Sequence, residues 1–163
     1  MPSNVRMREA RAEDVVAIVA LLADDVLGAG RETVSDPPAP AYVAAFEAIE
    51  ANPHDHLLVA EEDGVVVGCA QLTILHGLSR RGTSRALIEG VRIASSHRGG
   101  GLGAALIGHL VERAEAAGCG IVQLTSDASR TAAHAFYARL DFKATHVGMK
   151  LELAARDAGR AKR

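Results

Sequence analysis

The chain has 163 residues and a mass of 17.0 kDa, which suggests a single domain with a core from about residue 5 to 153 and a polar tail at 154–163. Hydrophobic residues reach 48% but aromatic residues only 3%, so a stacked-aromatic platform for single-stranded nucleic acid is not expected. The net charge of −2 lacks the basic excess of a nucleic-acid binder, and no apolar run approaches the roughly 18 residues of a membrane helix. We therefore expect neither nucleic acid nor membrane as a partner.

The two cysteines indicate a reducing compartment. Cys69 and Cys119 form neither a CxxC pair nor a metal-ligand spacing, and a disulfide framework needs more cysteines than these. The stretch Met1–Asn4 lacks a basic region followed by an apolar run, so no signal peptide is expected. The sequence thus predicts a cytoplasmic protein without a metal site.

The first third of the chain predicts one strand and two helices. Residues 5–9 alternate in the way of a strand, and residues 13–22 form an apolar helix pattern with acidic residues in its first turn. Residues 23–40 contain glycines and prolines that indicate an irregular loop. Residues 41–51 carry apolar side chains at the spacing of a second helix.

The middle of the chain predicts strands. Residues 57–60 and 65–75 are apolar runs separated by an Asp-Gly turn at residues 62–64, which is a hairpin signal. A loop at residues 76–83 precedes another strand at about 86–93.

The last third predicts a helix, a strand, a second helix and a final strand. A glycine-rich turn at residues 98–103 leads into a helix at 102–117, and the later elements are expected at residues 121–124, 131–140 and 142–153. The order βααβββαβαβ indicates an α/β fold, in which the central βαβ unit has a parallel, right-handed crossover.

The glycine-rich turn is the strongest chemical signal. Residues 98–103 read Arg-Gly-Gly-Gly-Leu-Gly between a strand and a helix. Glycines let backbone N–H groups face a ligand without a Cβ in the way, and a helix N-terminus adds unpaired donors and a positive dipole end. This arrangement favours a phosphate site, whereas the plainer alternative is a tight turn that only needs glycine.

The sequence of this turn can be compared with two nucleotide-binding motifs. Gly99, Gly101 and Ala104 match the G-x-G-x-x-G/A dinucleotide fingerprint, but that fingerprint opens a longer series of strand-helix units, and only about sixty residues follow here. A Rossmann-type NAD-binding oxidoreductase therefore remains an alternative. The Walker pattern is excluded because no Gly-Lys-Ser/Thr follows the glycines.

Three stretches together resemble the GNAT superfamily of acyl-CoA N-acyltransferases. Residues 98–103 fit its R/Q-x-x-G-x-G/A motif, residues 135–142 fit its A-x-FYxxxGF stretch, and residues 88–93 fit the preceding strand. The resemblance implies a mixed, mostly antiparallel central sheet with flanking helices. The ending at residues 142–151 looks like small-molecule acetyltransferases of the tabtoxin-resistance type.

The resemblance also implies a site for acetyl-CoA and a homodimer. It places backbone groups of Val91, Arg92 and Ile93 along the pantetheine arm. It places the pyrophosphate on a turn made of Arg98, Gly99, Gly100, Gly101, Leu102, Gly103 and Ala104. Arg130 stands where the family often has an Asn on the pantetheine and could reach a phosphate instead, and Asp141 stands in place of a family glycine. His134, one helical turn before Tyr137, is either a cofactor contact or a structural side chain.

Acetyl transfer to a primary amine needs a base, and Glu89 is the candidate. An alkylamine with a pKa near ~10.4 is mostly protonated at neutral pH, so a carboxylate must take its proton, directly or through water. Glu89 shares a face with Leu87, Val91 and Ile93 if no bulge interrupts the strand, and aliphatic surroundings raise a carboxyl pKa. The alternative is a rim carboxylate paired with a neighbouring arginine.

Tyr137 is the candidate acid. The departing thiolate has an intrinsic pKa near ~8.5, so a hydroxyl beside the sulfur eases its departure. The resemblance places Tyr137 there, whereas the alternative is a packing tyrosine.

The acceptor is not readable from the sequence, because two sets of charges conflict. The first loop, at residues 23–40, carries acidic residues that suggest a cationic amine, namely Asp24, Asp25, Glu32 and Asp36. In or near the second loop, at residues 76–83, basic residues suggest an acidic acceptor instead, namely Arg80, Arg81 and Arg85. The sequence predicts direct transfer from acetyl-CoA to a primary amine of a small molecule in a ternary complex. A non-catalytic binder of acyl-CoA or a nucleotide is the other open alternative.

Overall fold

The computed structural model describes residues 4–25 and 28–153. These residues fall into two compact units that divide after Leu124, and each unit is described by itself. The first unit contains β1 (Val5–Glu9), the 3-10 helix η1 (Ala12–Asp14), α1 (Val15–Ala23), α2 (Pro40–Ala51), β2 (Asp55–Glu62), β3 (Val65–Leu75), α3 (Ser79–Gly82), β4 (Arg85–Ile93), the 3-10 helix η2 (Ser95–His97), α4 (Leu102–Ala116) and β5 (Ile121–Leu124). The second unit contains α5 (Thr131–Ala138).

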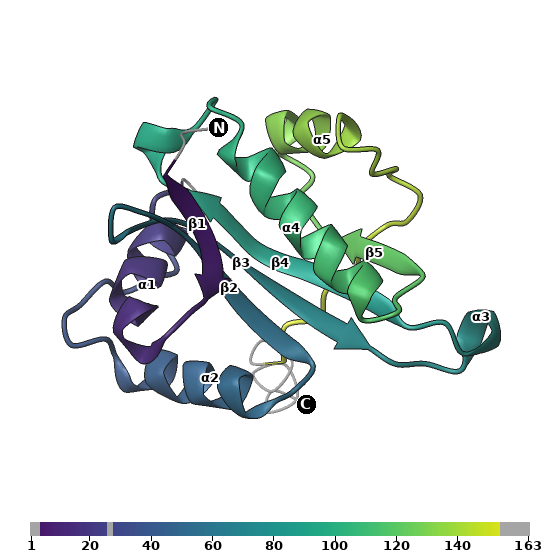
Figure 1. Ribbon diagram of the computed structural model, residues 1–163, viewed down its shortest axis with the longest axis horizontal. Coiled ribbons are helices and arrows are strands. Elements are labelled where there is room, and N and C mark those ends of the chain that lie inside the picture. The colour runs from purple at the N-terminus through teal and green to yellow at the C-terminus, as the bar shows by residue number, and fades with distance from the viewer. Residues whose placement is uncertain (1–3, 26–27, 154–163) are drawn as a thin grey trace, which may run out of the picture. The chain divides into compact units, whose positions relative to one another are not determined.

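The first unit is built on one sheet with the strand order β1-β2-β3-β4-β5 (Figure 1). Neighbouring strands from β1 to β4 are antiparallel, and β5 runs parallel to β4 after the α4 crossover. Asp63 and Gly64 turn the chain between β2 and β3 with φ of 50° and 82°, the positive values that a two-residue hairpin requires. The predicted mixed, mostly antiparallel sheet and its hairpin are confirmed.

Helices cover both faces of this sheet. Neighbouring residues of a strand point to opposite faces, and Val59 of β2 packs with Ile18 and Leu21 of α1 while Ala60 packs with Leu102 of α4. α2 lies beside α1, where Phe46 packs against α1 and is itself buried. α4 runs across β3 and β4 in Figure 1 and buries one apolar stripe that includes Leu106 and Leu110. Each such fully buried side chain stabilises the fold by about 1.5–3 kcal/mol.

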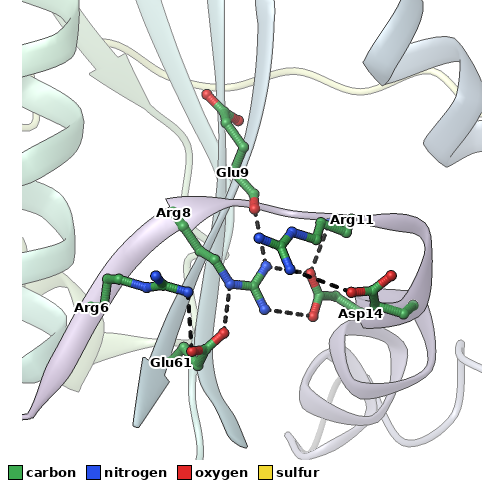
Figure 2. A network of polar contacts seen from close by, with 7 residues as sticks. Arg6, Arg8, Glu9, Arg11, Asp14 and Glu61 are labelled. Atoms are coloured by element: carbon green, nitrogen blue, oxygen red, sulfur yellow. Dashed lines mark hydrogen bonds and ion pairs between the residues drawn. The ribbon is translucent and has the colours of Figure 1, made fainter. Parts of the chain in front are cut away.

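A buried ion-pair network fixes the start of α1 to the sheet (Figure 2). The guanidinium of Arg8 donates to both carboxylate oxygens of Asp14, at 2.6 and 2.9 Å, and to Glu61 of β2 at 2.6 Å. The N–H of Arg11 donates to Asp14 at 2.7 Å, so one carboxylate closes the η1 turn and holds β1. The exposed fractions of the Arg8 and Asp14 side chains are 14% and 6%.

The network shifts the pKa values of Arg8, Asp14 and Glu61 in the direction of the charged forms. Burial opposes ionisation of Asp14, but the hydrogen bonds from Arg8 and from the Arg11 N–H outweigh it and lower the pKa of Asp14. The hydrogen bond from Arg8 lowers the pKa of Glu61, and the bond to Asp14 raises the pKa of Arg8. The folded protein therefore favours these groups in their ionised states.

The prediction of a final strand at residues 142–153 is wrong. These residues form no strand, and apolar side chains of the predicted alternation are exposed, with 85% of Val147 and 91% of Met149 accessible. Alternation predicts a strand only where a neighbouring strand accepts its hydrogen bonds, and none pairs with this segment in the described part of the chain. The helix before it ends at Ala138, close to the expected boundary.

Candidate functional site

The glycine turn lies where the sequence predicts it, between η2 and α4. Gly99 and Gly101 have φ of 81° and 84°, which is the left-handed region that favours glycine. A Cβ built on either residue meets no atom within 4 Å, so the space above the turn is open to a ligand. Leu102, which follows at once, is 1% exposed and fixes the beginning of α4 in the core.

The N-terminus of α4 presents backbone donors to this open space. Gly101 is the N-cap residue and provides no side-chain hydrogen bond to the helix. The first backbone bond of the helix runs from the N–H of Ala105 to the carbonyl of Gly101 at 3.1 Å. The N–H groups of Leu102, Gly103 and Ala104 precede this first helical donor and have no acceptor within the helix, and such N–H groups bind phosphate well.

β4 has a partly unpaired edge beside the turn. Its parallel pairing with β5 ends at Ile88 and Leu124, so β5 pairs with none of residues 89–93. Gly90 has a φ of 61° at a bulge, where two residues of β4 stand opposite one of β3. Val91, Arg92 and Ile93 are therefore the last residues of β4, beyond its pairing with β5. This position suits the predicted contact of their backbone groups with a pantetheine arm.

The bulge overturns the predicted alternation along β4. Glu89 pairs with Gln71 and Arg92 pairs with Cys69, so one extra residue lies between them and reverses the pattern. Ile93 consequently packs on the α4 face of the sheet, with Ala60 and Leu102, instead of sharing a face with Glu89.

Glu89 is exposed, which corrects the expectation that aliphatic side chains surround it. Its register partner Gln71 is half-buried, and no ion pair joins Glu89 to Arg85 or Arg92 within the described residues. A solvent-exposed carboxylate can accept a proton from an ammonium through water, so the role of Glu89 as a base stays a prediction.

Two of the three arginines of the predicted site are bound to aspartates that follow α1. Arg98 donates from Nη2 to the carboxylate of Asp24 at 2.9 Å and to its carbonyl oxygen at 2.7 Å. Arg92 pairs with Asp25 at 3.2 Å. Glu32, another acidic residue of the first loop, accepts a hydrogen bond from the Tyr42 hydroxyl at 2.8 Å. Three of the four acids that suggested a cationic acceptor thus have partners within the protein.

The second unit contains Arg130, His134 and Tyr137. Tyr137 lies on α5 and packs edge-to-face against Phe136 and Phe142, with ring centroids 5.1 and 5.9 Å away. The ring of His134 bonds through Nε2 to the carbonyl oxygen of Asp127 at 2.9 Å, which favours its structural alternative. Arg130 is the N-cap residue of α5.

Cysteine chemistry has little support in the structure. Burial raises the pKa of the Cys69 thiol to about 12, and burial also raises the pKa of Cys119. No group of three His, Cys, Asp or Glu side chains within residues 4–25 and 28–153 could hold a metal ion. The helices in this part of the chain are too short or too polar to traverse a lipid bilayer.

Sequence reasoning missed a hollow of about 340 Å³ at the opposite end of the sheet from the glycine turn. Its lining combines apolar residues of α2 with charged residues where β1 ends and β2 begins, among them Phe46, Glu9 and His56. Glu9 forms an ion pair with Arg113 at 2.6 Å and lies 3.3 Å from His56, so its charge is compensated. No local motif signals this hollow, because it is formed by residues that are far apart in the sequence.

The family follows from comparison of the whole chain with known proteins. The model of the acetyltransferase (GNAT) family matches residues 15–142, which include the glycine turn, β4 and α5. The chain belongs to the GNAT acetyltransferase family. This membership confirms the resemblance found in the sequence.

Several known proteins are similar to this chain in sequence and structure. A solved structure from Agrobacterium tumefaciens, described as a putative acetyltransferase, has 29% identity and a TM-score of 0.80 over 90% of this chain and 99% of its own. A Bacillus halodurans protein described as a transcriptional regulator has 42% identity and a TM-score of 0.89 over 91% of this chain and 99% of its own. Glucosamine 6-phosphate N-acetyltransferase from Trypanosoma brucei brucei is 39% identical over 90 residues, or 55% of this chain. That match spans only 59% of the relative's length.

Proposed function

We propose that the protein transfers the acetyl group of acetyl-CoA directly to a primary amine of a small molecule, within a ternary complex. The observation that carries this proposal is the open glycine turn at the uncapped start of α4, beside the unpaired edge of β4 that bears Glu89. Backbone N–H groups of the turn bind the pyrophosphate, and residues 91–93 bind the pantetheine arm. The open Cβ positions of Gly99 and Gly101 leave room for this approach.

Two side chains handle the protons of the reaction. The amine nitrogen forms a bond to the acetyl carbon as the bond from that carbon to sulfur breaks. Glu89 accepts the proton that the ammonium loses, through a water molecule, and Tyr137 donates its hydroxyl proton to the departing thiolate. Each proton transfer of this kind contributes roughly 10²–10⁴-fold to the rate.

The first acceptor class to test is amino-sugar phosphates. This choice is supported by the relative from Trypanosoma brucei brucei, which is a glucosamine 6-phosphate N-acetyltransferase. Glutamate and aspartate side chains of the first loop are largely engaged with the protein's own arginines and tyrosine, which removes the reason to favour a cationic acceptor.

An acceptor panel that records released CoA thiol tests the proposed reaction. The panel compares glucosamine 6-phosphate with glucosamine, amino acids, aminoglycosides and aminophosphonates. We expect thiol release with at least one amine, and loss of the signal with the N-acetylated form of that amine. Acetyl-CoA binding without release for any amine would favour the non-catalytic binder, and thermal stabilisation by NAD instead of acetyl-CoA would favour the oxidoreductase.

Substitution of Glu89 and Tyr137 tests the mechanism with any amine that is accepted. Glu89→Gln should lower kcat at pH 7 and lose much less at pH 9–10, because more of the amine is then already neutral. Tyr137→Phe should lower kcat with little change in acetyl-CoA affinity, because the thiolate develops only in the transition state. A deficit of Glu89→Gln that persists at high pH, or a Tyr137→Phe enzyme within about twofold of wild type, would contradict these roles.

The proposal also covers the cellular compartment and the oligomeric state of the protein, on the basis of the two free cysteines and the family resemblance. Cys69 and Cys119 are unpaired thiols, which suits a reducing compartment such as the cytoplasm. We also expect a homodimer, which light scattering of the purified protein checks.

A further inference from the structure

The end of α1 contacts the predicted cofactor turn through Asp24. Its carboxylate Oδ2 accepts hydrogen bonds from the backbone N–H of Ser95 at 3.2 Å and from Arg98 Nη2 at 2.9 Å. The carbonyl oxygen of Asp24 accepts a further bond from Arg98 at 2.7 Å. One residue thus binds both η2 and the first residue of the glycine turn.

Arg98 is directed into the protein by these contacts. Its Nε donates to the carbonyl oxygen of Ile93 at 2.9 Å, and its Nη2 donates to Asp24. The guanidinium therefore bridges the end of β4 and the end of α1. Two of its three nitrogens are committed to the protein, so the side chain closes the base of the turn.

The neighbouring pair repeats this connection at a more buried position. Arg92 pairs with Asp25 at 3.2 Å, with side-chain exposed fractions of 19% and 14%, and donates to the carbonyl oxygen of Val91 at 2.9 Å. The Asp24 and Arg98 side chains are 45% and 50% exposed. Two consecutive aspartates after α1 therefore hold the two arginines that flank the end of β4.

We propose that Asp24 is a positioning residue for the cofactor turn, and that Arg98 supports the turn through Asp24 and Ile93 instead of binding phosphate. This inference rests on the proposed function. The bonds to Ser95 and Arg98 fix η2 and the beginning of the turn, so the N–H groups that follow are already oriented when acetyl-CoA arrives. Affinity then depends on Asp24 although Asp24 carries the same sign of charge as the ligand.

Direct binding of phosphate by Arg98 would predict the opposite change in acetyl-CoA affinity when Asp24 is replaced. If Arg98 bound the pyrophosphate directly, the Asp24 carboxylate would compete with the ligand for the guanidinium. Removal of the Asp24 charge would then leave acetyl-CoA affinity unchanged or increase it, because like charges repel and Arg98 would be released. The sign of the change in affinity separates the two roles.

A double-mutant cycle measures that sign. Calorimetric titration of acetyl-CoA is made with wild type, Asp24→Asn, Arg98→Gln and the double variant, and kcat is measured at saturating acetyl-CoA. We expect each single variant to raise the Kd roughly tenfold, the double variant to be no weaker than either single variant, and kcat of Asp24→Asn to stay near wild type. An Asp24→Asn protein that binds acetyl-CoA as well as or better than wild type would overturn the proposal, and so would additive effects.

A second measurement needs no ligand and stays decisive if acetyl-CoA does not bind. Hydrogen exchange of the free protein should be faster across residues 93–103 in Asp24→Asn, with other peptides unchanged. The control is Glu13→Gln, which breaks another exposed ion pair, that of Glu13 with Arg11 at 3.5 Å, away from the turn. The control should match wild type in exchange and in acetyl-CoA Kd. Unchanged exchange at residues 93–103 in Asp24→Asn would refute the positioning role, whereas absence of acetyl-CoA binding by wild type would refute the proposed function.

Discussion

α1 is held at both ends by an aspartate bound to an arginine, but the two ends differ in burial. At its beginning, the Asp14 and Arg8 side chains are almost enclosed, and the pKa of Asp14 is lowered (Figure 2). Beyond its end, about half of the Asp24 and Arg98 side chains is exposed. The same pair of residue types therefore serves two purposes. A buried pair fixes the fold, because a partner left alone there cannot be hydrated, whereas an exposed pair contributes little to stability and can act on the shape of a neighbouring loop.

Loss of the buried carboxylate should have the largest effect on stability. Asp14→Asn leaves Arg8 partly unpaired and weakens the bond that closes η1, so we expect the free energy of unfolding to fall by about 3 kcal/mol. Urea denaturation at pH 7 measures this change. Glu13→Gln, beside it in the sequence but 72% exposed at the side chain, should stay within about 0.5 kcal/mol of wild type. Equal effects of the two substitutions would show that burial does not distinguish the pairs.

Acid should remove part of the same stabilisation. The pKa values of Asp14 and Glu61 are lower in the folded protein than their ordinary values, so the unfolded chain binds more protons as the pH falls. The contribution is fully present above the unfolded pKa values of about 4 and is lost as the pH falls through the folded values. We expect urea denaturation between pH 6 and 3 to show a difference between wild type and Asp14→Asn that shrinks in acid. A constant difference across this range would mean that ionisation of Asp14 is not its source.

The smallest effect on stability is expected at the exposed pair. Asp24→Asn should change the free energy of unfolding by less than about 1 kcal/mol, because solvent screens the charges of a half-exposed pair. The same urea series measures it. A loss as large as that of Asp14→Asn would mean that Asp24 maintains the fold as a whole, and a change in acetyl-CoA affinity could then not be assigned to the turn.

The features that local sequence chemistry controls could be predicted. The glycine turn, the Asp63–Gly64 hairpin and the apolar stripe of α4 each follow from adjacent residues, and the structure contains all three. The bulge in β4 was foreseeable, since Gly90 interrupts an apolar strand and a glycine inside a strand often marks a bulge. That single residue decides that Glu89 and Ile93 lie on opposite faces of the sheet.

Features that depend on distant partners could not be predicted. The bonds of Asp24 to Ser95 and Arg98 join residues more than seventy positions apart, and no local pattern specifies them. Charge alone suggested that the acids of the first loop attract a cationic substrate, because a sequence does not reveal which carboxylates are neutralised by the protein. The alternation at residues 142–153 likewise does not show whether a neighbouring strand is available for pairing, and within the described residues none pairs with this segment.

Acetyl-CoA titration of a matched pair of glycine variants tests the assignment of the glycine turn most directly. Gly101 and Gly64 have φ of 84° and 82°, and a Cβ on either meets no atom within 4 Å, so valine should cause similar backbone strain at both positions. Only Gly101 lies at the predicted pyrophosphate site. We expect folded Gly101→Val to lose acetyl-CoA binding in calorimetric titration, while Gly64→Val binds like wild type. Normal binding by folded Gly101→Val would contradict the assignment of this turn to the cofactor.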